Sequence, residues 1–487
     1  MRFAAVAAAL SLAGCAHLAP GFTCPAQGGA AWREVETDHF VLQTDLGSGD
    51  AAGLVRSLEA MYASLLAAFF RVPPPLPAKV RVVAFRTESE YLEFAPDQAL
   101  AYFTHDDLGE PLIVTPGALG FDQRIILAHE LAHHVTRQVF VRQPHWFAEG
   151  IAALAEPLGA SGLQTRPSFG GLIPARQVAL LRLQRVPVAE LLAWDGVEPY
   201  DSRYHDSSAL LVNYLLHREG PRFVELQRRF AMAEDPAAAW RAAFPEWDPA
   251  KPGATEKLDA LLVDHLHVGH ISVRIVEVEP VVQPVERPLS AARVHTLRLV
   301  LQRFGRLDRS EARAAEQLRA EVDEALAEDP DHAVALRRRC ERDGSDPLPL
   351  ARRAARAHPD DPRAWLWLAT SVTGDAGAAE RFAALQHAVE LEGSSPVALG
   401  RLAAERATRR EIAEAIPLAV RAVRLAPDNA GALATAAAVL AAASRCDAAA
   451  AAATRAVEVL PERAGRDERR AFERQRDEIL AGCAARR

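Results

Sequence analysis

The C-terminal part of the chain contains a repeat, which constrains its fold more than any single motif does. Four turn-forming residues follow one another at intervals of 34 residues: Pro359, Gly393, Pro427 and Pro461. Apolar positions recur in register with them, at Trp365, Leu399 and Leu433 and again at Leu391 and Leu425. A sustained period of this length is typical of stacked helical hairpins, because one hairpin cannot bury its apolar face alone.

The repeated segments HPDDPRAWLWLA, EGSSPVALGRLA and APDNAGALATAA resemble the tetratricopeptide repeat, and a looser copy begins near Asp329. The resemblance implies an all-α helical repeat domain over residues 291–487 that binds a protein partner. The aromatic consensus of the family is poorly kept, so only the architecture carries over.

Two cysteines lie at the end of this repeat. Cys446 falls in the turn of the last expected hairpin, and Cys483 falls near the end of the closing helix. A disulfide between them would staple the C-terminal cap, and we state it as a hypothesis because geometry decides pairing. The separations of Cys24 and Cys340 from the others do not match a zinc knuckle or a CxxC redox site.

The N-terminus has the order of a secretory signal. A basic Arg2 precedes an apolar run that is too short to span a bilayer, and Leu12-Ala13-Gly14-Cys15 follows. LAGC resembles the bacterial lipobox, which implies a signal peptide at 1–14, lipidation of Cys15 and a tether at 15–31. The resemblance places the protein in the bacterial cell envelope, anchored to the membrane by its N-terminal lipid, with Ala16 favouring the outer membrane. The alternative is a plain signal peptide with a stray cysteine.

Length and charge bound the remaining possibilities. A chain of 487 residues is too long for one ordinary core, so two or three domains are expected. The net charge of −8 argues against a general nucleic-acid binder, whose affinity would rest on neutralising phosphates. Strand-like segments precede helical ones in residues 32–270, which predicts an α+β domain. Residues 271–290 are extended and punctuated by proline, which predicts a linker.

The α+β part contains ILAHELAHH, in which His129 and His133 lie four residues apart on an expected helix. Side chains at this spacing share one face, so both imidazoles can reach one metal ion. A zinc site with an open position needs a third protein ligand, which Glu149 supplies from the next helix. Glu130 lies beside the metal, where it would act as the general base on a zinc-bound water.

HELAH followed by PHWFAEGIA resembles the gluzincin metallopeptidases, the thermolysin-related peptidase MA-like group. The resemblance covers roughly residues 32–268 and implies a zincin-like fold with one Zn²⁺ ion. It also implies an edge strand at Leu112–Val114 that holds an extended peptide substrate. A tyrosine of the family that stabilises the transition state corresponds to Tyr204, with His205 and the weaker Tyr200 as alternatives.

Three further residues are less specific. His134 projects about 100° away from His133 around the helix, so it is expected in the second shell or at the surface. His145 either lines the cleft or is a solvated loop residue. Asp206 is one guess among several for the residue that orients the ligand histidines.

Three functions are open at this point. The favoured one is a lipid-anchored zinc metallopeptidase that cleaves peptides or proteins, with the repeats recruiting a partner or substrate. The second is a non-catalytic scaffold lipoprotein that uses its repeats for assembly. The third is metal-dependent hydrolysis of something other than a peptide, which only analogy at the level of the fold suggests.

Overall fold

The structure is a computed structural model that describes most of the chain. The described residues are 22–70, 79–95, 99–105, 110–159, 166–182, 185–195, 202–268, 273–276, 278–302, 311–460 and 465–485. The predicted signal peptide, the lipidation site Cys15 and the alternative donor Tyr200 lie outside these residues.

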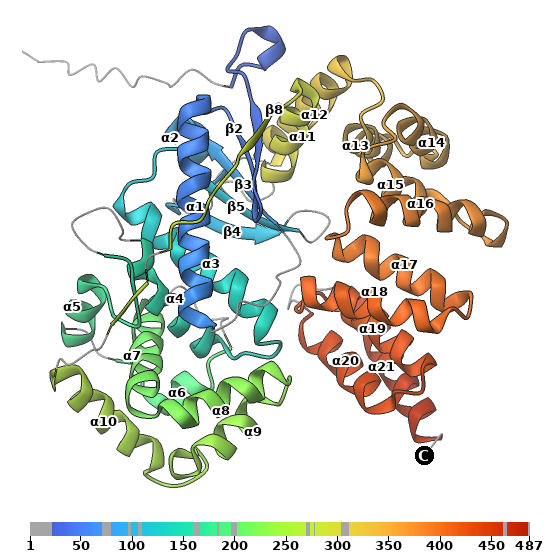
Figure 1. Cartoon of the computed structure of the whole chain (residues 1–487). Helices are drawn as coiled ribbons and strands as arrows, with labels where there is room; N and C mark the ends of the chain where they lie inside the picture. The colour runs from blue at the N-terminus through green and yellow to red at the C-terminus, as the bar shows by residue number, and fades with distance from the viewer. Residues whose placement is uncertain are drawn as a thin grey trace, which may run out of the picture.

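A six-stranded mixed sheet forms the centre of the first domain (Figure 1). Its order is β4-β5-β3-β2-β1-β8, and β2, β3 and β5 run parallel to one another. The strands are β1 (Arg33–Glu36), β2 (Phe40–Thr44), β3 (Val80–Phe85), β4 (Tyr102–His105), β5 (Pro111–Pro116) and β8 (Val285–Pro288). A two-stranded sheet joins β6 (Ser168–Phe169) to β7 (Arg274–Ile275).

The edge of this sheet differs from the sequence expectation. Leu112–Val114 lies in β5, which is paired on both sides, with β3 and with β4. The edge strand is β4, which runs antiparallel to β5. The expected edge position of Leu112–Val114 is therefore wrong, because an antiparallel strand of mixed polarity, inconspicuous in sequence, covers it.

Both faces of the sheet are covered by helices, and alternation along β3 decides which residue faces which layer. Val80, Val82 and Ala84 join the larger core, whereas Val83 and Phe85 join a smaller core on the opposite face. A strand buried on both faces reads as a continuous apolar run, which explains VRVVAF.

The larger core is built from helices that fill the rest of the first domain. They are α1 (Ser48–Phe69), α3 (Phe121–Val139), α4 (His145–Gly159), α5 (Pro174–Arg182), α6 (Val188–Leu192), α7 (Ser202–Arg218), α8 (Gly220–Ala231), α9 (Pro236–Ala243) and α10 (Ala254–Val268). Short 3₁₀ turns lie at Pro25–Gln27 and Pro245–Trp247. The domain thus combines a mixed sheet with helices, which is the α+β class expected from the sequence.

The expected linker at 271–290 is in part structured. Its residues 274–275 form β7, and residues 285–288 form β8, which pairs antiparallel with β1 and extends the main sheet. The smaller core is completed by α2 (Glu88–Phe94) and by α11 (Ala291–Gln302), which contributes Val294, Leu297 and Leu301. The first helix of the predicted repeat domain therefore packs on the first domain.

An array of helical hairpins forms the second half of the chain (Figure 1). After α12 (Glu311–Glu328) come α13 (Ala333–Asp343), α14 (Pro347–Ala357), α15 (Pro362–Ser371), α16 (Ala378–Leu391), α17 (Pro396–Thr408), α18 (Ile412–Leu425), α19 (Ala430–Ala442), α20 (Cys446–Glu458) and α21 (Arg466–Ala484). A 3₁₀ turn at Asp375–Gly377 precedes α16. Among the described residues, α13 to α20 form four consecutive hairpins, with α21 packed on the last.

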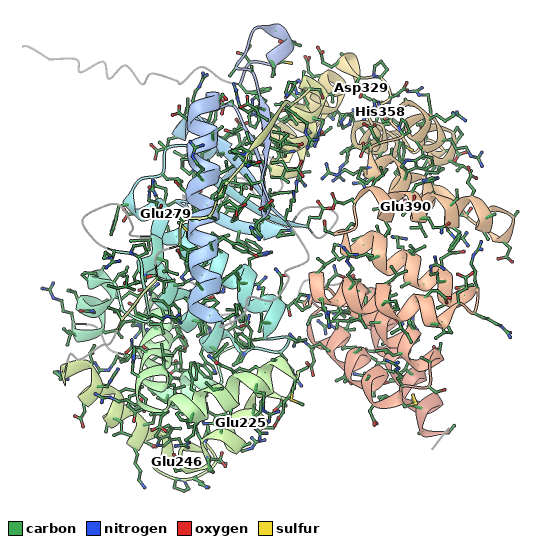
Figure 2. The ribbon with its side chains drawn as sticks, viewed as in Figure 1. Glu225, Glu246, Glu279, Asp329, His358 and Glu390 are labelled. Atoms are coloured by element: carbon green, nitrogen blue, oxygen red, sulfur yellow. A yellow bond between two sulfur atoms is a disulfide. The ribbon has the colours of Figure 1, made fainter. Side chains whose placement is uncertain are left out.

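The repeat has a local cause in helix capping. Asp361, Ser395 and Asn429 lie 34 residues apart and begin α15, α17 and α19. In each, the side-chain oxygen accepts a hydrogen bond from a backbone N–H two or three residues later. Such a cap satisfies a donor that the helix itself leaves unpaired. His358 and Asp329 link successive loops of the array at 3.1 Å (Figure 2).

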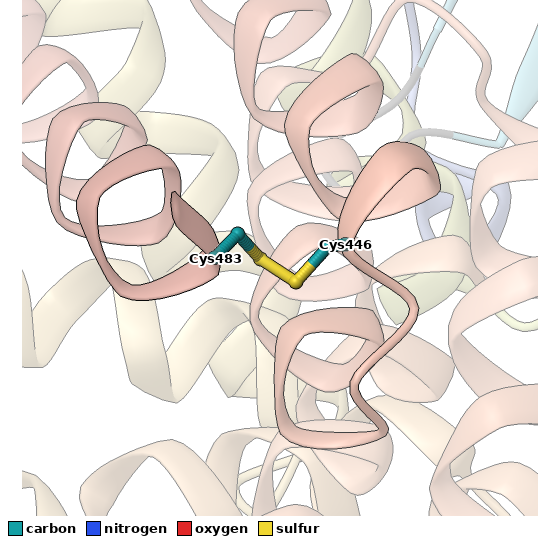
Figure 3. Close-up of a disulfide and its surroundings, with 2 residues drawn as sticks. All are labelled: Cys446 and Cys483. Atoms are coloured by element: carbon teal, nitrogen blue, oxygen red, sulfur yellow. A yellow bond between two sulfur atoms is a disulfide. The ribbon is translucent and has the colours of Figure 1, made fainter. Parts of the chain in front are cut away.

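A disulfide ties the C-terminal end of the array together. Cys446, at the start of α20, is bonded to Cys483 near the end of α21, with Cα atoms 5.4 Å apart (Figure 3). This is the pair hypothesised from the sequence. It holds α21 against the last hairpin.

The array contacts the first domain at both of its ends. At the first end, the Arg298 guanidinium of α11 lies 3.2 Å from the Glu93 carboxylate of α2. At the other end, Arg142 donates a hydrogen bond of 3.1 Å to Glu458 at the end of α20. The array therefore leaves the first domain at α11 and returns to it beside the loop between α3 and α4.

Among the described helices, α1 is the one whose length and apolar character would suit a membrane span. Half of its apolar window is buried inside the protein. Leu54, Val55, Leu58 and Leu65 lie in the larger core, so the apolar character of α1 is accounted for by packing.

Candidate metal centre

The α3–α4 helical hairpin carries the predicted ligands. His129 and His133 lie on α3, one turn apart, and Glu149 lies in the first half of α4. α4 begins directly after Pro144, whose carbonyl accepts hydrogen bonds from the N–H groups of Phe147 and Ala148. The turn between the helices directs Glu149 back towards the histidines.

Two aromatic residues fix the position of α4. The Trp146 ring lies 5.6 Å from Trp240, and the Phe147 ring lies 5.0 Å from Phe230. Both side chains are buried, which anchors the first turn of α4 against α8 and α9. Gly150 then allows close packing, since a Cβ atom there would lie 2.4 Å from Val212 Cγ2 of α7. The sequence prediction that small residues permit a close helix crossing is confirmed at Gly150.

The three predicted ligands converge. His129 Nε2 lies 3.1 Å from His133 Nε2 and 3.2 Å from Glu149 Oε2. His133 Nε2 lies 3.4 Å from Glu149 Oε1, and one ligand atom from each residue lies within 4.8 Å of the other two. Atoms bound about 2.0–2.1 Å from a tetrahedral zinc ion are about 3.3 Å apart. The spacing of the three donor atoms therefore fits a single zinc ion.

A fourth side chain approaches the same carboxylate. His205 Nε2, from the start of α7, lies 3.5 Å from Glu149 Oε2. The neighbouring Tyr204 turns elsewhere, because its hydroxyl donates a hydrogen bond to Glu190. Of the two donors considered at this position, His205 is the one with a contact to the ligand set.

Trp194 lies at the centre of an aromatic group beside the ligands. Its ring lies 5.0 Å from Tyr204, 5.6 Å from His205 and 5.8 Å from His145. His145 itself is exposed. The ring of Trp194 thus links the start of α4 to the start of α7.

A buried carboxylate orients the first ligand. Glu156 Oε1 lies 3.1 Å from His129 Nδ1, which leaves Nε2 directed towards Glu149. Arg176 of α5 donates two hydrogen bonds to Glu156, at 2.5 and 2.8 Å, and one of 2.5 Å to Asp206 of α7. A histidine that binds a metal through one nitrogen usually donates its other N–H to such a partner. Glu156 fills this role for His129.

The charges at the site favour a cation. Burial would lower the pKa of His129, but hydrogen bonds from Glu149 and Glu156 outweigh it and raise this pKa to about 10. Burial would likewise raise the pKa of Glu149, but the two neighbouring histidines hold it below its usual value. Burial would raise the pKa of Glu156, and hydrogen bonds from Arg176 and His129 reverse that effect. A proton on His129 therefore occupies a place where two carboxylates would equally stabilise a metal ion.

The remaining candidates lie around this cluster. Glu130 is half-buried, and its charge contributes to the raised pKa of His129. His134 points away from the ligands and packs 6.5 Å from the Tyr62 ring and 6.1 Å from the Phe103 ring. Burial raises the pKa of Asp206, and the charge of Arg176 only partly opposes this. Asp206 thus acts on His129 indirectly, through Arg176 and Glu156.

Sequence reasoning missed Glu156, Arg176 and Trp194. Glu156 follows Glu149 by seven residues, and this spacing of two turns places both on one face of α4. That spacing was a usable signal. Arg176 and Trp194 reach the site through tertiary packing, and nothing local in the sequence marks them.

Comparisons with known proteins add information about the repeats. No protein-family model matches the chain, and no curated protein matches it. Among solved structures, the chain is similar to MamA (residue 41 to the end) from Desulfovibrio magneticus RS-1, with 17% identity and a TM-score of 0.24, over 31% of this chain and 96% of that one. It is also similar to yeast Tom70, with 14% identity and a TM-score of 0.28, over 58% of this chain and 61% of that one. These neighbours are tetratricopeptide-like helical repeat proteins.

This finding corrects the expected enzyme. The matched structures are repeat scaffolds and not metallopeptidases, which points away from peptide-bond hydrolysis. The assignment as a zinc metallopeptidase is therefore wrong by this comparison, and the general-base role of Glu130 and the transition-state role of Tyr204 fall with it. The complete HExxH motif is what suggested catalysis, but its geometry equally serves metal binding alone.

Proposed function

We propose that the protein is a lipid-anchored, protein-binding scaffold whose first domain holds one zinc ion. The convergence of His129, His133 and Glu149 supports the metal, and the helical array supports the binding of a protein partner. In this account the ligand set remains gluzincin-like, while the zinc serves structure at the place where the array returns to the first domain.

The argument for zinc rests on the donor set and its surroundings. Two imidazoles and one carboxylate suit Zn²⁺, and their spacing fits one tetrahedral ion. His133 Nδ1 is buried without a hydrogen-bond partner among the described residues, so Nε2 is its functional nitrogen. Glu156 fixes the tautomer of His129, as the partner of a metal-binding histidine does.

The zinc content of the purified chain tests this part of the proposal. We expect about one zinc ion per chain, and its loss in Glu149→Gln. Glu130→Gln is the matched control, because it makes the same change of carboxylate to amide one residue from a ligand and should retain the metal. A folded chain that holds no zinc, or a Glu149→Gln variant that holds as much as the wild type, would refute the metal site.

The argument for a protein partner rests on the array. Stacked hairpins expose an extended, continuous surface, and the sequence spends about a third of the chain on it. Arg142, in the loop that precedes α4, donates a hydrogen bond to Glu458 of α20. A protein held on the array therefore lies beside the segment that carries Glu149.

Site-specific photo-crosslinking in cells tests the partner. A crosslinking residue at Arg401 of α17 or at Ala438 of α19 replaces an exposed side chain in the first helix of a hairpin. Both should give adducts of one discrete mass. The same residue at the exposed Asp264 of α10 should give none. Adducts that are absent from the array, or equal at all three positions, would contradict a specific partner.

The anchor is the third part of the proposal, and the lipobox-like LAGC supports it. Mass spectrometry of the mature N-terminus tests it directly. We expect an N-terminal Cys15 that carries acyl chains, and its loss in Cys15→Ala. Two or more acyl chains would give stable anchoring, whereas one alone would not.

A further inference from the structure

A second polar cluster lies far from the metal ligands, where the N-terminal segment meets α11 and α12. Cys24 Sγ lies 3.1 Å from His295 Nε2, and His295 Nδ1 lies 2.6 Å from Glu321 Oε2. Arg298 donates a hydrogen bond of 2.7 Å to Glu321 Oε1. Four side chains from three separate segments thus form one connected network.

The order of partners assigns each group a role. Glu321 accepts the Nδ1–H of His295, which leaves Nε2 as an acceptor for the Cys24 thiol. A thiol beside a base that a carboxylate orients is the arrangement of an activated nucleophile. Arg298 balances the charge of Glu321, so the pair can support a positive imidazolium. Neither the metal site nor the array uses this chemistry.

Burial separates this thiol from solvent in the closed form. Cys24 is 4% exposed and His295 is 3% exposed. The residues around Cys24 are different, because Phe22, Thr23, Pro25, Ala26 and Gln27 are all half-buried or exposed. Cys24 is therefore the one buried side chain of a short surface segment, residues 22–28, and lifting that segment exposes it.

Few contacts hold the segment in place. The Phe22 ring lies 3.8 Å from the Arg298 guanidinium carbon, and Gln27 donates a hydrogen bond of 3.1 Å to Glu324 of α12. The other hydrogen bonds of its 3₁₀ turn are internal, from Gln27 and Gly29 to the Cys24 carbonyl. Local opening of such a segment costs far less than global unfolding.

We propose that Cys24 is a thiol-exchange site that reacts with small-molecule disulfides when the segment lifts. His295 Nε2 takes the thiol proton, and the Cys24 thiolate attacks one sulfur of the disulfide. One S–S bond breaks and one forms, which leaves a mixed disulfide on Cys24. The released thiolate takes the proton from His295, so the exchange balances without any further oxidant.

The adduct has a structural consequence. The closed cluster has no room beside Cys24 Sγ, which is almost fully buried and 3.1 Å from His295. A mixed disulfide therefore prevents the segment from closing again. Exchange at Cys24 would release the N-terminal segment from the junction of the two halves, independently of the zinc site and of lipidation.

The chain supplies its own control in Cys340. This free cysteine is equally buried, at 5% exposed, but its Sγ donates to the carbonyl of Ser345 at 2.9 Å and no histidine contact is described for it. Burial raises the pKa of the Cys340 thiol. The two cysteines thus differ mainly in the presence of a base.

The test is incubation of the full-length chain in detergent with oxidised glutathione, followed by peptide mass mapping over time. We expect Cys24 to be modified at least about tenfold faster than Cys340. His295→Gln should slow the reaction of Cys24 by about tenfold and leave Cys340 unchanged. Equal rates at the two cysteines, or a rate at Cys24 that is unchanged or faster in His295→Gln, would overturn the proposal.

A second variant and a second readout cover the case in which His295→Gln fails to fold. Glu321→Gln keeps a hydrogen-bond acceptor for His295 but removes its charge, and should slow the reaction of Cys24 to an intermediate rate. Hydrogen exchange of residues 22–29 should rise after modification of the wild type and stay unchanged in treated Cys24→Ser. Protection that persists in the modified wild type would contradict release of the segment.

Discussion

The region around the metal ligands and the hairpin array are both helical, yet they are stabilised in different ways. Around α3, α4 and α7, charged side chains from separate segments meet in the interior, as Glu156, Arg176 and Asp206 do. In the array, small apolar residues fill the core, and the ion pairs lie mostly at the surface, such as Arg352 with Glu380. The first region depends on a few residues, whereas the array distributes its stability over many similar contacts.

The largest effect should come from the buried network. Arg176→Met leaves Glu156 and Asp206 buried without their cation, which should cost about 3–5 kcal/mol in the free energy of unfolding. Zinc affinity should fall about 10–100-fold, because Glu156 no longer holds His129 firmly. Denaturant unfolding and a competitive zinc titration measure the two effects.

The matched change in the array is Arg352→Met, which removes an exposed ion pair with Glu380. We expect no measurable change in stability there. Equal losses from the two substitutions would abolish the distinction between the regions.

Removal of the disulfide tests the array at its end. Cys446→Ser with Cys483→Ser opens a loop with a sequence separation of 37 and should cost the C-terminal hairpin about 2–4 kcal/mol. Hydrogen exchange should rise in α20 and α21 and stay unchanged in α13 and α14, because contacts in the array are between neighbours. Exchange that rises uniformly along the array would show that it unfolds as one unit.

Acid should weaken the start of the array through His332. Burial lowers the pKa of this histidine to about 4, so it is neutral in the folded chain at pH values where the unfolded chain is protonated. Its contribution is complete above about pH 6.5 and is lost as the pH falls towards 4, by about 2–3 kcal/mol in total. Unfolding of the wild type and of His332→Gln between pH 7 and 4 measures this. An identical pH dependence in both would exclude His332 as the source.

The smallest effects come from one substitution made in both regions. Gly150→Ala places a Cβ atom 2.4 Å from Val212 Cγ2 and 2.6 Å from the Ser208 carbonyl oxygen, and should destabilise the first domain by about 1–3 kcal/mol. Gly400, inside α17, has open space where its Cβ would lie. Gly400→Ala should therefore stabilise the array by about 0.5–1 kcal/mol. Thermal unfolding measures both signs, and a shared sign would show that the space around the two glycines is not what decides.

How far the sequence predicted each region follows from the same difference. The array was readable because its signals are local and repeated, as the 34-residue spacing of Asp361, Ser395 and Asn429 shows. The ligands His129, His133 and Glu149 were readable because metal binding demands a short spacing on one helix face.

Arg176 and Trp194 were not readable, because tertiary packing alone brings them to the site. The return of residues 285–288 to pair with β1 was hidden for a similar reason. Those residues are exposed, and their pairing is set by a partner strand about 250 residues away. The enzyme assignment failed for another reason: the motif specifies a ligand geometry, and a ligand geometry does not specify a reaction.

X-ray absorption at the zinc edge tests the central claim most directly, because it reports the ligands of the ion itself. For the purified chain we predict two imidazole nitrogens and carboxylate oxygen at about 2.0–2.2 Å, with one imidazole lost in His133→Ala. Sulfur ligands at about 2.3 Å, or a spectrum without imidazole, would contradict a zinc ion held by His129, His133 and Glu149.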